Sequence, residues 1–312
     1  MGGNNLVNLA LMHPRLFTSL ILIDPVIQRL PSPEGNFGPA KASTTRREVW
    51  PSRKAAEEKL KKSKFYQAWD PRVLDRWLEY GLREMPTYHF PHATAASSTP
   101  PTITADPSTA TVPPAKDTEK EVTLRTTKHQ EVLTFLRPNF PTPEYPNPSI
   151  EPNPVTHADV DTTAQPAAPF YSPVPISTFH RLQYLRPSVF YVFGDPEAGA
   201  FLSSPVLKAD KLAYTGVGVG GSGGVKQGRV SSVTFDGIGH LIPMEVVERT
   251  ADECVGRLKP ELDRWKAIED AERAEWAQVP RKKKSVLSEE YVKVMTGDWM
   301  GDAQDKAKKS KL

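Results

Sequence analysis

The sequence predicts an α/β fold with a mostly parallel sheet flanked by helices, and three observations lead to this class. Residues 20–23 form the aliphatic run Leu-Ile-Leu-Ile, which is typical of a strand covered on both faces. Two further segments, the apolar run Val189–Phe193 and the mixed run Val230–Phe235, are also candidates for buried strands. A short apolar helix over residues 6–12 precedes the first run, and an amphipathic helix from Val247 follows the last. Helices that alternate with buried strands favour a parallel sheet.

The number of strands is small for such a sheet. Even with the weak candidate Val122–Leu124, too few apolar runs are present for a doubly wound fold. The first helix begins at Met1-Gly2-Gly3 with no strand before it, which is an odd start for a domain. We therefore expect the partner strands to lie upstream of Met1.

Composition excludes several classes of protein. The 312 residues carry a net charge of +3, too balanced for a general nucleic-acid-binding surface. No apolar run approaches the roughly 18 residues that span a bilayer. The single cysteine, Cys254, forms no internal disulfide, and no Cys/His cluster has zinc spacing. We expect a soluble protein without metal or cofactor.

Composition also divides the chain into segments. The apolar helix and strand lie in residues 1–40, and residues 41–176 form a helical cap segment. Residues 177–278 form a core with a histidine loop, and residues 279–312 form a charged tail.

Within the cap segment, two helices are predicted ahead of a proline- and threonine-rich stretch. One runs from the N-cap Ser52 to about Ala68, and the other starts at Asp70-Pro71 and stops at Gly81. Residues 93–114 and 141–169 are predicted to be disordered, with the ordered island Val122–Phe140 between them.

A histidine follows the last strand candidate in the pattern strand, Gly-x-Gly-His240, helix. The glycines allow the backbone to turn so that the imidazole faces back over the sheet. Carboxylates end the other two runs, with Asp24 after the first and both Asp195 and Glu197 after the second. Histidine and carboxylate side chains at strand ends indicate acid–base chemistry, although a histidine in this position is more often a surface or core residue.

The start of the chain resembles the second half of the G-x-S-x-G nucleophile elbow, because Met1-Gly2-Gly3 leads into a small-residue helix and the strand Leu-Ile-Leu-Ile-Asp-Pro. With the His240 loop and the glycine-rich run Thr215–Gly224 before its strand, the chain resembles the α/β-hydrolase superfamily. Within it, the similarity is to fungal peroxisomal lipases and toxin-biosynthesis hydrolases, and it covers about a third of the chain. In this resemblance Met1-Gly2 is the final x-G, so the nucleophile stands one residue before Met1. Serine is favoured there over aspartate, the nucleophile of epoxide hydrolases and dehalogenases, because those families usually have an aromatic residue where Met1 stands.

The resemblance implies acyl transfer to serine, with a small-molecule carboxylic ester or lipid as substrate. His240 would act as general base and a carboxylate would hold its tautomer. The favoured carboxylate is Asp24, and Glu197 and Asp195 are the alternates. The backbone N–H of Met1 would serve as one oxyanion-hole donor.

Because the serine would lie before Met1, the chain as given is expected to be inactive. The alternative, from another class, is a non-catalytic remnant or binding protein of the same fold. That protein would expose a strand edge and the apolar face of its first helix.

The last three residues, Ser310-Lys311-Leu312, match the peroxisomal import address, which a receptor reads at the extreme C-terminus. A chance match to a given tripeptide is on the order of one in ten thousand. The sequence therefore predicts an import receptor as partner and the peroxisomal matrix as location.

Overall fold

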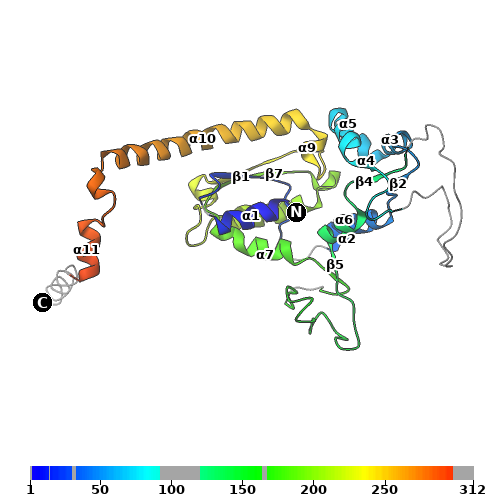
Figure 1. The fold of residues 1–312 in the computed structure, drawn as a ribbon, viewed down its shortest axis with the longest axis horizontal. Helices are drawn as coiled ribbons and strands as arrows, with labels where there is room; N and C mark the ends of the chain where they lie inside the picture. Colours follow the sequence, from blue (N-terminus) through cyan, green and yellow to red (C-terminus); the bar gives the residue numbers. More distant parts are fainter. Residues whose placement is uncertain (1, 14, 30–32, 92–119, 164–166, 298–312) are drawn as a thin grey trace. The chain divides into compact units, whose positions relative to one another are not determined.

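The computed structural model describes residues 2–13, 15–29, 33–91, 120–163 and 167–297 (Figure 1). The chain forms two compact units, Met1–Leu258 and Lys259–Leu312. Among the described residues, no helix is both long enough and apolar enough to cross a membrane.

The first unit is built on a parallel sheet with the strand order β1-β7-β8. Its strands are β1 (Ser19–Ile23), β7 (Ser188–Phe193) and β8 (Val230–Thr234). β7 lies in the middle and all six of its residues are buried. The three predicted strands therefore pair in parallel. The central strand β7 has a neighbour on each edge and is covered on both faces, and a strand in that position needs mostly apolar side chains.

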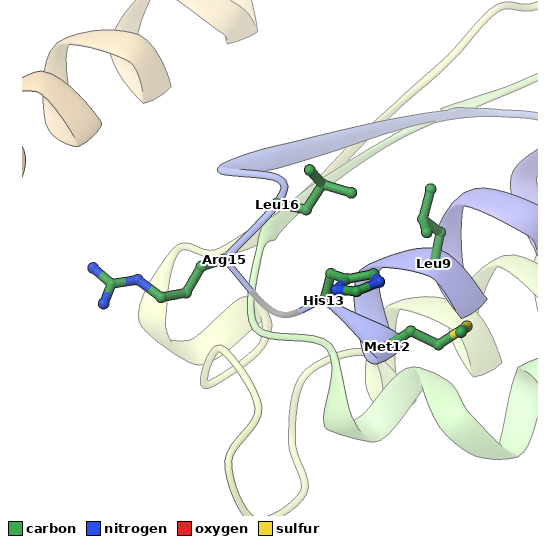
Figure 2. Close-up of a pocket in the computed structure, with 5 residues that line it drawn as sticks. All are labelled: Leu9, Met12, His13, Arg15 and Leu16. Carbon is green, nitrogen blue, oxygen red and sulfur yellow. The ribbon is translucent and has the colours of Figure 1, made fainter.

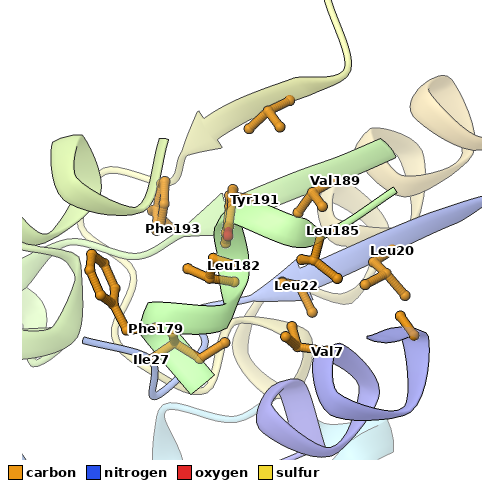
Figure 3. Packing of buried hydrophobic residues seen from close by; sticks show 12 residues of the cluster. Val7, Leu20, Leu22, Ile27, Phe179, Leu182, Leu185, Val189, Tyr191 and Phe193 are labelled. Atoms are coloured by element: carbon orange, nitrogen blue, oxygen red, sulfur yellow. The ribbon is translucent and has the colours of Figure 1, made fainter. Parts of the chain in front are cut away.

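One face of this sheet is covered by α1 (Gly2–Met12), α7 (Pro173–Arg181) and the 3-10 turn η1 (Leu182–Tyr184). The helix α1 packs against both α7 and β1. Figure 3 shows the apolar cluster between them. Its buried members are Val7, Ala10, Leu20, Leu22, Ile27, Phe179, Leu182, Leu185, Val189, Tyr191, Phe193 and Val230.

The opposite face is covered by α9 (Ile242–Glu245) and by Val246, and α10 (Val247–Gln278) follows, with Arg249 over the ring of Phe235. Because side chains alternate along a strand, Ile21 and Ile23 of β1 belong to this face. They pack with a second cluster formed by Phe190, Val192, Phe235 and Ile242. Both faces of the sheet are thus covered by helices.

The cap segment contains its own antiparallel sheet in the order β2-β4-β3. Its strands are β2 (Val49–Trp50), β4 (Val122–Leu124) and β3 (Leu82–Glu84). The prediction that Val122–Leu124 is a candidate for the main sheet was therefore wrong. A three-residue buried run pairs equally well with short antiparallel neighbours, and its sequence does not reveal which sheet it joins.

The predicted cap helices are present with one difference. The predicted helix from Ser52 to Ala68 is two helices, α3 (Arg53–Lys61) and α4 (Lys64–Gln67). Ser52 caps α3 by accepting the backbone N–H of Ala55. The remaining cap helices are α2 (Pro33–Thr45), α5 (Pro71–Tyr80) and α6 (Lys128–Phe135), with Asp70 and Gly81 as the caps of α5.

Residues 141–169 differ from the predicted disorder. The described residues 141–163 and 167–169 form hydrogen-bonded turns beside the two-stranded sheet β5 (Arg137–Pro138) and β6 (Phe170–Tyr171). Buried Asn139 holds them, because its side-chain amide donates to the carbonyl oxygens of Pro148 at 3.2 Å and Ala167 at 2.7 Å. Residues 93–114 lie outside the described residues.

The C-terminal half of the chain supplies the remaining elements. Pro260 lies inside α10, which continues through it as one helix. The others are η2 (Pro196–Ala198), η3 (Phe201–Ser203), α8 (Pro205–Tyr214), η4 (Val225–Gln227), η5 (Arg281–Lys283) and α11 (Glu289–Thr296).

Candidate active site

Three loops meet at one edge of the parallel sheet. Parallel strands point the same way, so the loops that follow β1, β7 and β8 all leave from its carboxyl edge, where open α/β sheets bind their ligands. These loops carry Asp24, Asp195 and His240. The loop of residues 236–241 after β8 is called the histidine loop below.

Asp24 and His240 form a hydrogen-bonded pair across this edge. The distance from His240 Nδ1 to Asp24 Oδ2 is 2.6 Å, although 216 positions separate the residues. The Asp24 side chain is 1% exposed and the His240 side chain 41% exposed. With Nδ1 donating to the carboxylate, Nε2 is left as the free base of the ring. The contact predicted between these two residues is present.

The backbone at Asp24 turns sharply. Its φ is +36°, and its N–H donates to the carbonyl of Val192 at 2.7 Å. Aspartate tolerates this region better than most residues, although the conformation still carries strain. The turn brings the carboxylate back over the end of β7 instead of continuing along the strand.

The second oxygen of Asp24 is also occupied, because Ser203 Oγ donates to Oδ1. Ser203 is fully buried and its hydroxyl faces the carboxylate, not the imidazole, so it does not have the geometry of a nucleophile activated by His240. Sequence reasoning missed this residue. Nothing near Ser203 in the sequence signals a contact with a residue 179 positions away.

Asp195, one of the alternate acids, supports the histidine loop. Its two carboxylate oxygens accept backbone N–H groups, Oδ1 from Glu197 and Oδ2 from Gly237, both at 2.9 Å. The hydrogen bonds from Gly237 and from Glu197 lower the pKa of Asp195. The other alternate, Glu197, is exposed. Among the described residues, Asp24 is the only carboxylate bonded to His240.

Further contacts hold the histidine loop in place. The N–H of Asp195 donates to the carbonyl of Ile238 at 2.7 Å, and the N–H of Gly239 donates to Glu245 Oε2 at 3.2 Å. Gly194 allows the close approach, because a Cβ there would lie 2.6 Å from the carbonyl oxygen of Gly239. The sequence pattern flagged Gly239 but not Gly194 or Glu245.

The first turn of α1 lies against the loop that carries Asp24. The Asn4 side-chain amide donates to the carbonyl of Val26 at 2.9 Å. A Cβ built on Gly3 would lie 3.1 Å from Cβ of Pro25, so the helix and the loop are in close contact. Met1, the predicted oxyanion-hole donor, lies outside the described residues, as do Ser310, Lys311 and Leu312.

The cap segment contacts the chain immediately after His240. Leu241 and Met244 pack against the apolar cap cluster that includes Trp69. The N–H of Asp70 donates to the carbonyl of Met244 at 2.7 Å. The start of α5 is therefore anchored to α9, one turn beyond His240.

Two other features lie away from this edge. A hollow of about 580 Å³ is lined by Leu9, Met12, His13, Arg15 and Leu16, whose side chains are drawn in Figure 2. These residues precede β1, so the hollow lies toward the amino end of the sheet. The glycine-rich run 215–224 precedes β8 and packs on η1, where a Cβ at Gly221 would lie 2.5 Å from the carbonyl oxygen of Gln183. No cluster of metal-ligating side chains occurs in the described part of the chain.

Comparison with known proteins finds clear sequence relatives. The type I acyl-CoA thioesterase mpaH of Penicillium roqueforti is 38% identical over 301 residues, which is 94% of the chain and 64% of the relative. The abhydrolase domain-containing protein AFT2-1 of Alternaria alternata is 22% identical over 302 residues, covering 95% of the chain and 94% of that protein. No protein-family model matches the chain.

Solved structures give weaker matches. The peroxisomal α/β-hydrolase Lpx1 from Saccharomyces cerevisiae is 12% identical, with a TM-score of 0.47, over 98% of this chain and 60% of that one. The chain spans 59% to 64% of the length of the thioesterase relatives it matches. The thioesterase and abhydrolase relatives are consistent with the parallel sheet and with the Asp24–His240 pair at its edge. The chain belongs to the α/β-hydrolase superfamily.

Proposed function

We propose that this chain supplies the acid and the base of a serine hydrolase that cleaves small-molecule acyl esters or thioesters. The observation that carries the proposal is the 2.6 Å contact between His240 Nδ1 and the buried carboxylate of Asp24. A half-exposed imidazole that is hydrogen-bonded through Nδ1 to a buried carboxylate is arranged as a general base, because the carboxylate fixes which ring nitrogen carries the proton. Its location at the carboxyl edge of a parallel sheet is where this superfamily performs its chemistry.

In the proposed mechanism, His240 Nε2 removes the proton of a serine hydroxyl that attacks the substrate carbonyl. The ring later returns the proton to the leaving alcohol or thiol. Asp24 keeps the Nδ1 proton in place and stabilises the imidazolium that forms. The nucleophile is proposed to stand next to Met1 at the start of α1, and the backbone N–H of Met1 to bind the oxyanion.

The named relatives narrow the substrate class. Three of them are called acyl-CoA thioesterases, so an acyl thioester is the first substrate to test. The leaving thiol is a better leaving group than an alcohol and needs less help from the general acid. Because the cap segment is anchored next to His240, we place substrate choice there.

The first experiment reads the coding frame upstream of Met1 and expresses the protein that it encodes. Gly-x-Ser joined to Met1 is expected, and that protein is expected to release free thiol from acyl-CoA. A fluorophosphonate probe is expected to label the serine, since activated serines react with such probes. The control is the same protein with that serine replaced by alanine, which loses both signals.

Two outcomes would contradict the proposal. A residue other than serine directly before Met1 removes the serine assignment. A well-folded protein with that serine but no turnover of acyl-CoA or a simple ester instead supports a non-catalytic binding protein of the same fold.

We also propose that the protein works in the peroxisomal matrix, on the strength of Ser310-Lys311-Leu312. A fluorescent protein fused to the N-terminal side is expected to collect in peroxisomes in fungal cells. Deletion of Leu312 alone is expected to leave the fusion diffuse, because the receptor reads the tripeptide only at the free C-terminus. A diffuse signal with the intact C-terminus would contradict the assignment.

A further inference from the structure

The carboxylate of Asp24 uses both of its oxygens within the protein. Oδ2 receives the Nδ1 hydrogen of His240, and Oδ1 receives the hydroxyl hydrogen of Ser203. Asp24 is 1% exposed and Ser203 is fully buried, so the hydrogen bond between them is shielded from solvent. A buried carboxylate that lost one of these donors would be left with an unsatisfied oxygen.

Ser203 is itself held rigidly. It is the last residue of η3, and its N–H donates to the carbonyl of Ala200 at 2.8 Å. Next to it, the ammonium group of Lys211 donates to the carbonyl of Leu202 at 2.8 Å. Lys211 is only 1% exposed. These contacts keep the serine hydroxyl at one position relative to Asp24.

The charge on Lys211 also matters to the acid. Burial lowers the pKa of Lys211 to about 8, and the nearby charge of Asp24 opposes that decrease. At neutral pH the lysine is therefore still mainly protonated, and it is attracted to the Asp24 carboxylate. Asp24 and Lys211 thus bind adjacent residues of η3, Ser203 and Leu202.

We propose that Ser203 is a positioning residue, which acts on the reaction through Asp24 by keeping Oδ2 directed at Nδ1 of His240. A carboxylate bonded at one oxygen only can rotate about its Cβ–Cγ bond, and the bond to the imidazole then weakens. The hydroxyl of Ser203 removes that freedom and stabilises the negative charge of a buried carboxylate. The catalytic part of this role rests on the proposed hydrolase function, whereas the effect on the Asp24–His240 bond does not.

The test compares Ser203→Ala and Ser203→Cys with the original protein. Alanine removes the donor, and cysteine retains a side chain of similar size but is a weak donor. If alanine prevents folding, cysteine still separates the hydrogen bond from the packing. The matched control is Ser188→Ala, which removes another fully buried hydroxyl, one that donates to the carbonyl of Thr18 at the amino end of β7.

The first measurement is the proton NMR resonance of His240 Nδ1–H in the full chain. We expect a downfield signal that disappears in His240→Ala. In Ser203→Ala and Ser203→Cys we expect it to exchange with water at least tenfold faster, and in Ser188→Ala to stay unchanged. An unchanged exchange rate in both Ser203 variants, or no such signal in the original chain, overturns the proposal.

The second measurement is the kinetics of the protein that contains the nucleophile. Ser203→Ala is expected to lower kcat about tenfold with KM within twofold of the original, because the substrate does not touch Ser203. If that protein shows no turnover while the NMR signal still responds to Ser203, the proposed function fails and the positioning of Asp24 stands. If turnover is normal and kcat is the same in both Ser203 variants, the positioning role in catalysis fails alone.

Discussion

Exchange of Asp24 for asparagine is expected to lower kcat about 10⁴-fold in the protein that contains the nucleophile, with KM and the melting temperature nearly unchanged. Asparagine has the same shape and still accepts the Ser203 hydroxyl through its oxygen. It also tolerates the φ of +36° at this position. However, its NH₂ group would face His240 Nδ1, so the ring proton would have to move to Nε2. The base would then be protonated on the side that must accept the serine proton.

The measurement is kcat and KM on an acyl thioester, together with a thermal melt. Two controls accompany it. Glu197→Gln changes the exposed alternate acid, and Asp210→Asn breaks a surface ion pair with Arg29 at 3.4 Å. Both are expected to retain kcat. If Asp24→Asn keeps more than a tenth of the original kcat, or if Glu197→Gln loses it, Asp24 is not the acid.

The sequence alone was enough to predict the core of the fold and the central pair of the site. The strands β1 and β7 are mostly apolar runs bounded by turn residues, which is typical of buried strands, whereas β8 is the mixed run Val-Ser-Ser-Val-Thr. Their parallel arrangement then places the residues that follow them at one edge, so Asp24 and His240 could be expected to meet. Strand direction places Asp195 at the same edge as well, and the preference for Asp24 came from the resemblance to the hydrolase group.

The supporting contacts could not be predicted in the same way. Ser203 and Glu245 reach Asp24 and the histidine loop through side-chain geometry, which depends on where η3 and α9 pack. A single serine or glutamate in a helical turn of three or four residues has no periodic pattern that marks its partner. The same reason explains the error at Val122–Leu124, since a short buried run does not indicate which strands it pairs with.

The ordered turns at residues 141–169 show a limit of composition as a guide. Proline, threonine and aspartate favour disorder on average, but the same residues make turns when a few buried donors hold them. Here one asparagine, Asn139, bonds to two carbonyls of the segment from a buried position. Its effect depends on a fold that brings residues 139, 148 and 167 together.

Gly194→Ala is expected to lower kcat at least 100-fold and to reduce stability by about 1–3 kcal/mol. A Cβ at this position would lie 2.6 Å from both Cβ of Ala200 and the carbonyl oxygen of Gly239, and 2.9 Å from the carbonyl oxygen of Ile238. None of these atoms belongs to a long flexible side chain, so the backbone itself must move. The histidine loop would then separate from the end of β7, and the hydrogen bond from Asp195 N–H to the Ile238 carbonyl would lengthen from 2.7 Å. A displacement of about 1 Å at His240 is enough for a loss of this size.

The matched control is Gly256→Ala, in α10, where a Cβ meets nothing within 4 Å. It is expected to leave kcat unchanged and to raise stability by up to about 1 kcal/mol, because alanine is the better helix former. The measurements are kcat, KM and a denaturant or thermal unfolding curve for each variant. A Gly194→Ala protein with the original kcat would mean that the histidine loop accommodates the methyl group without moving His240. Gly194 is connected to catalysis only through the position of the His240 imidazole relative to Asp24. If that position did not change, the close contact between the loops after β7 and β8 would contribute to packing, but the Asp24–His240 pair would not depend on it.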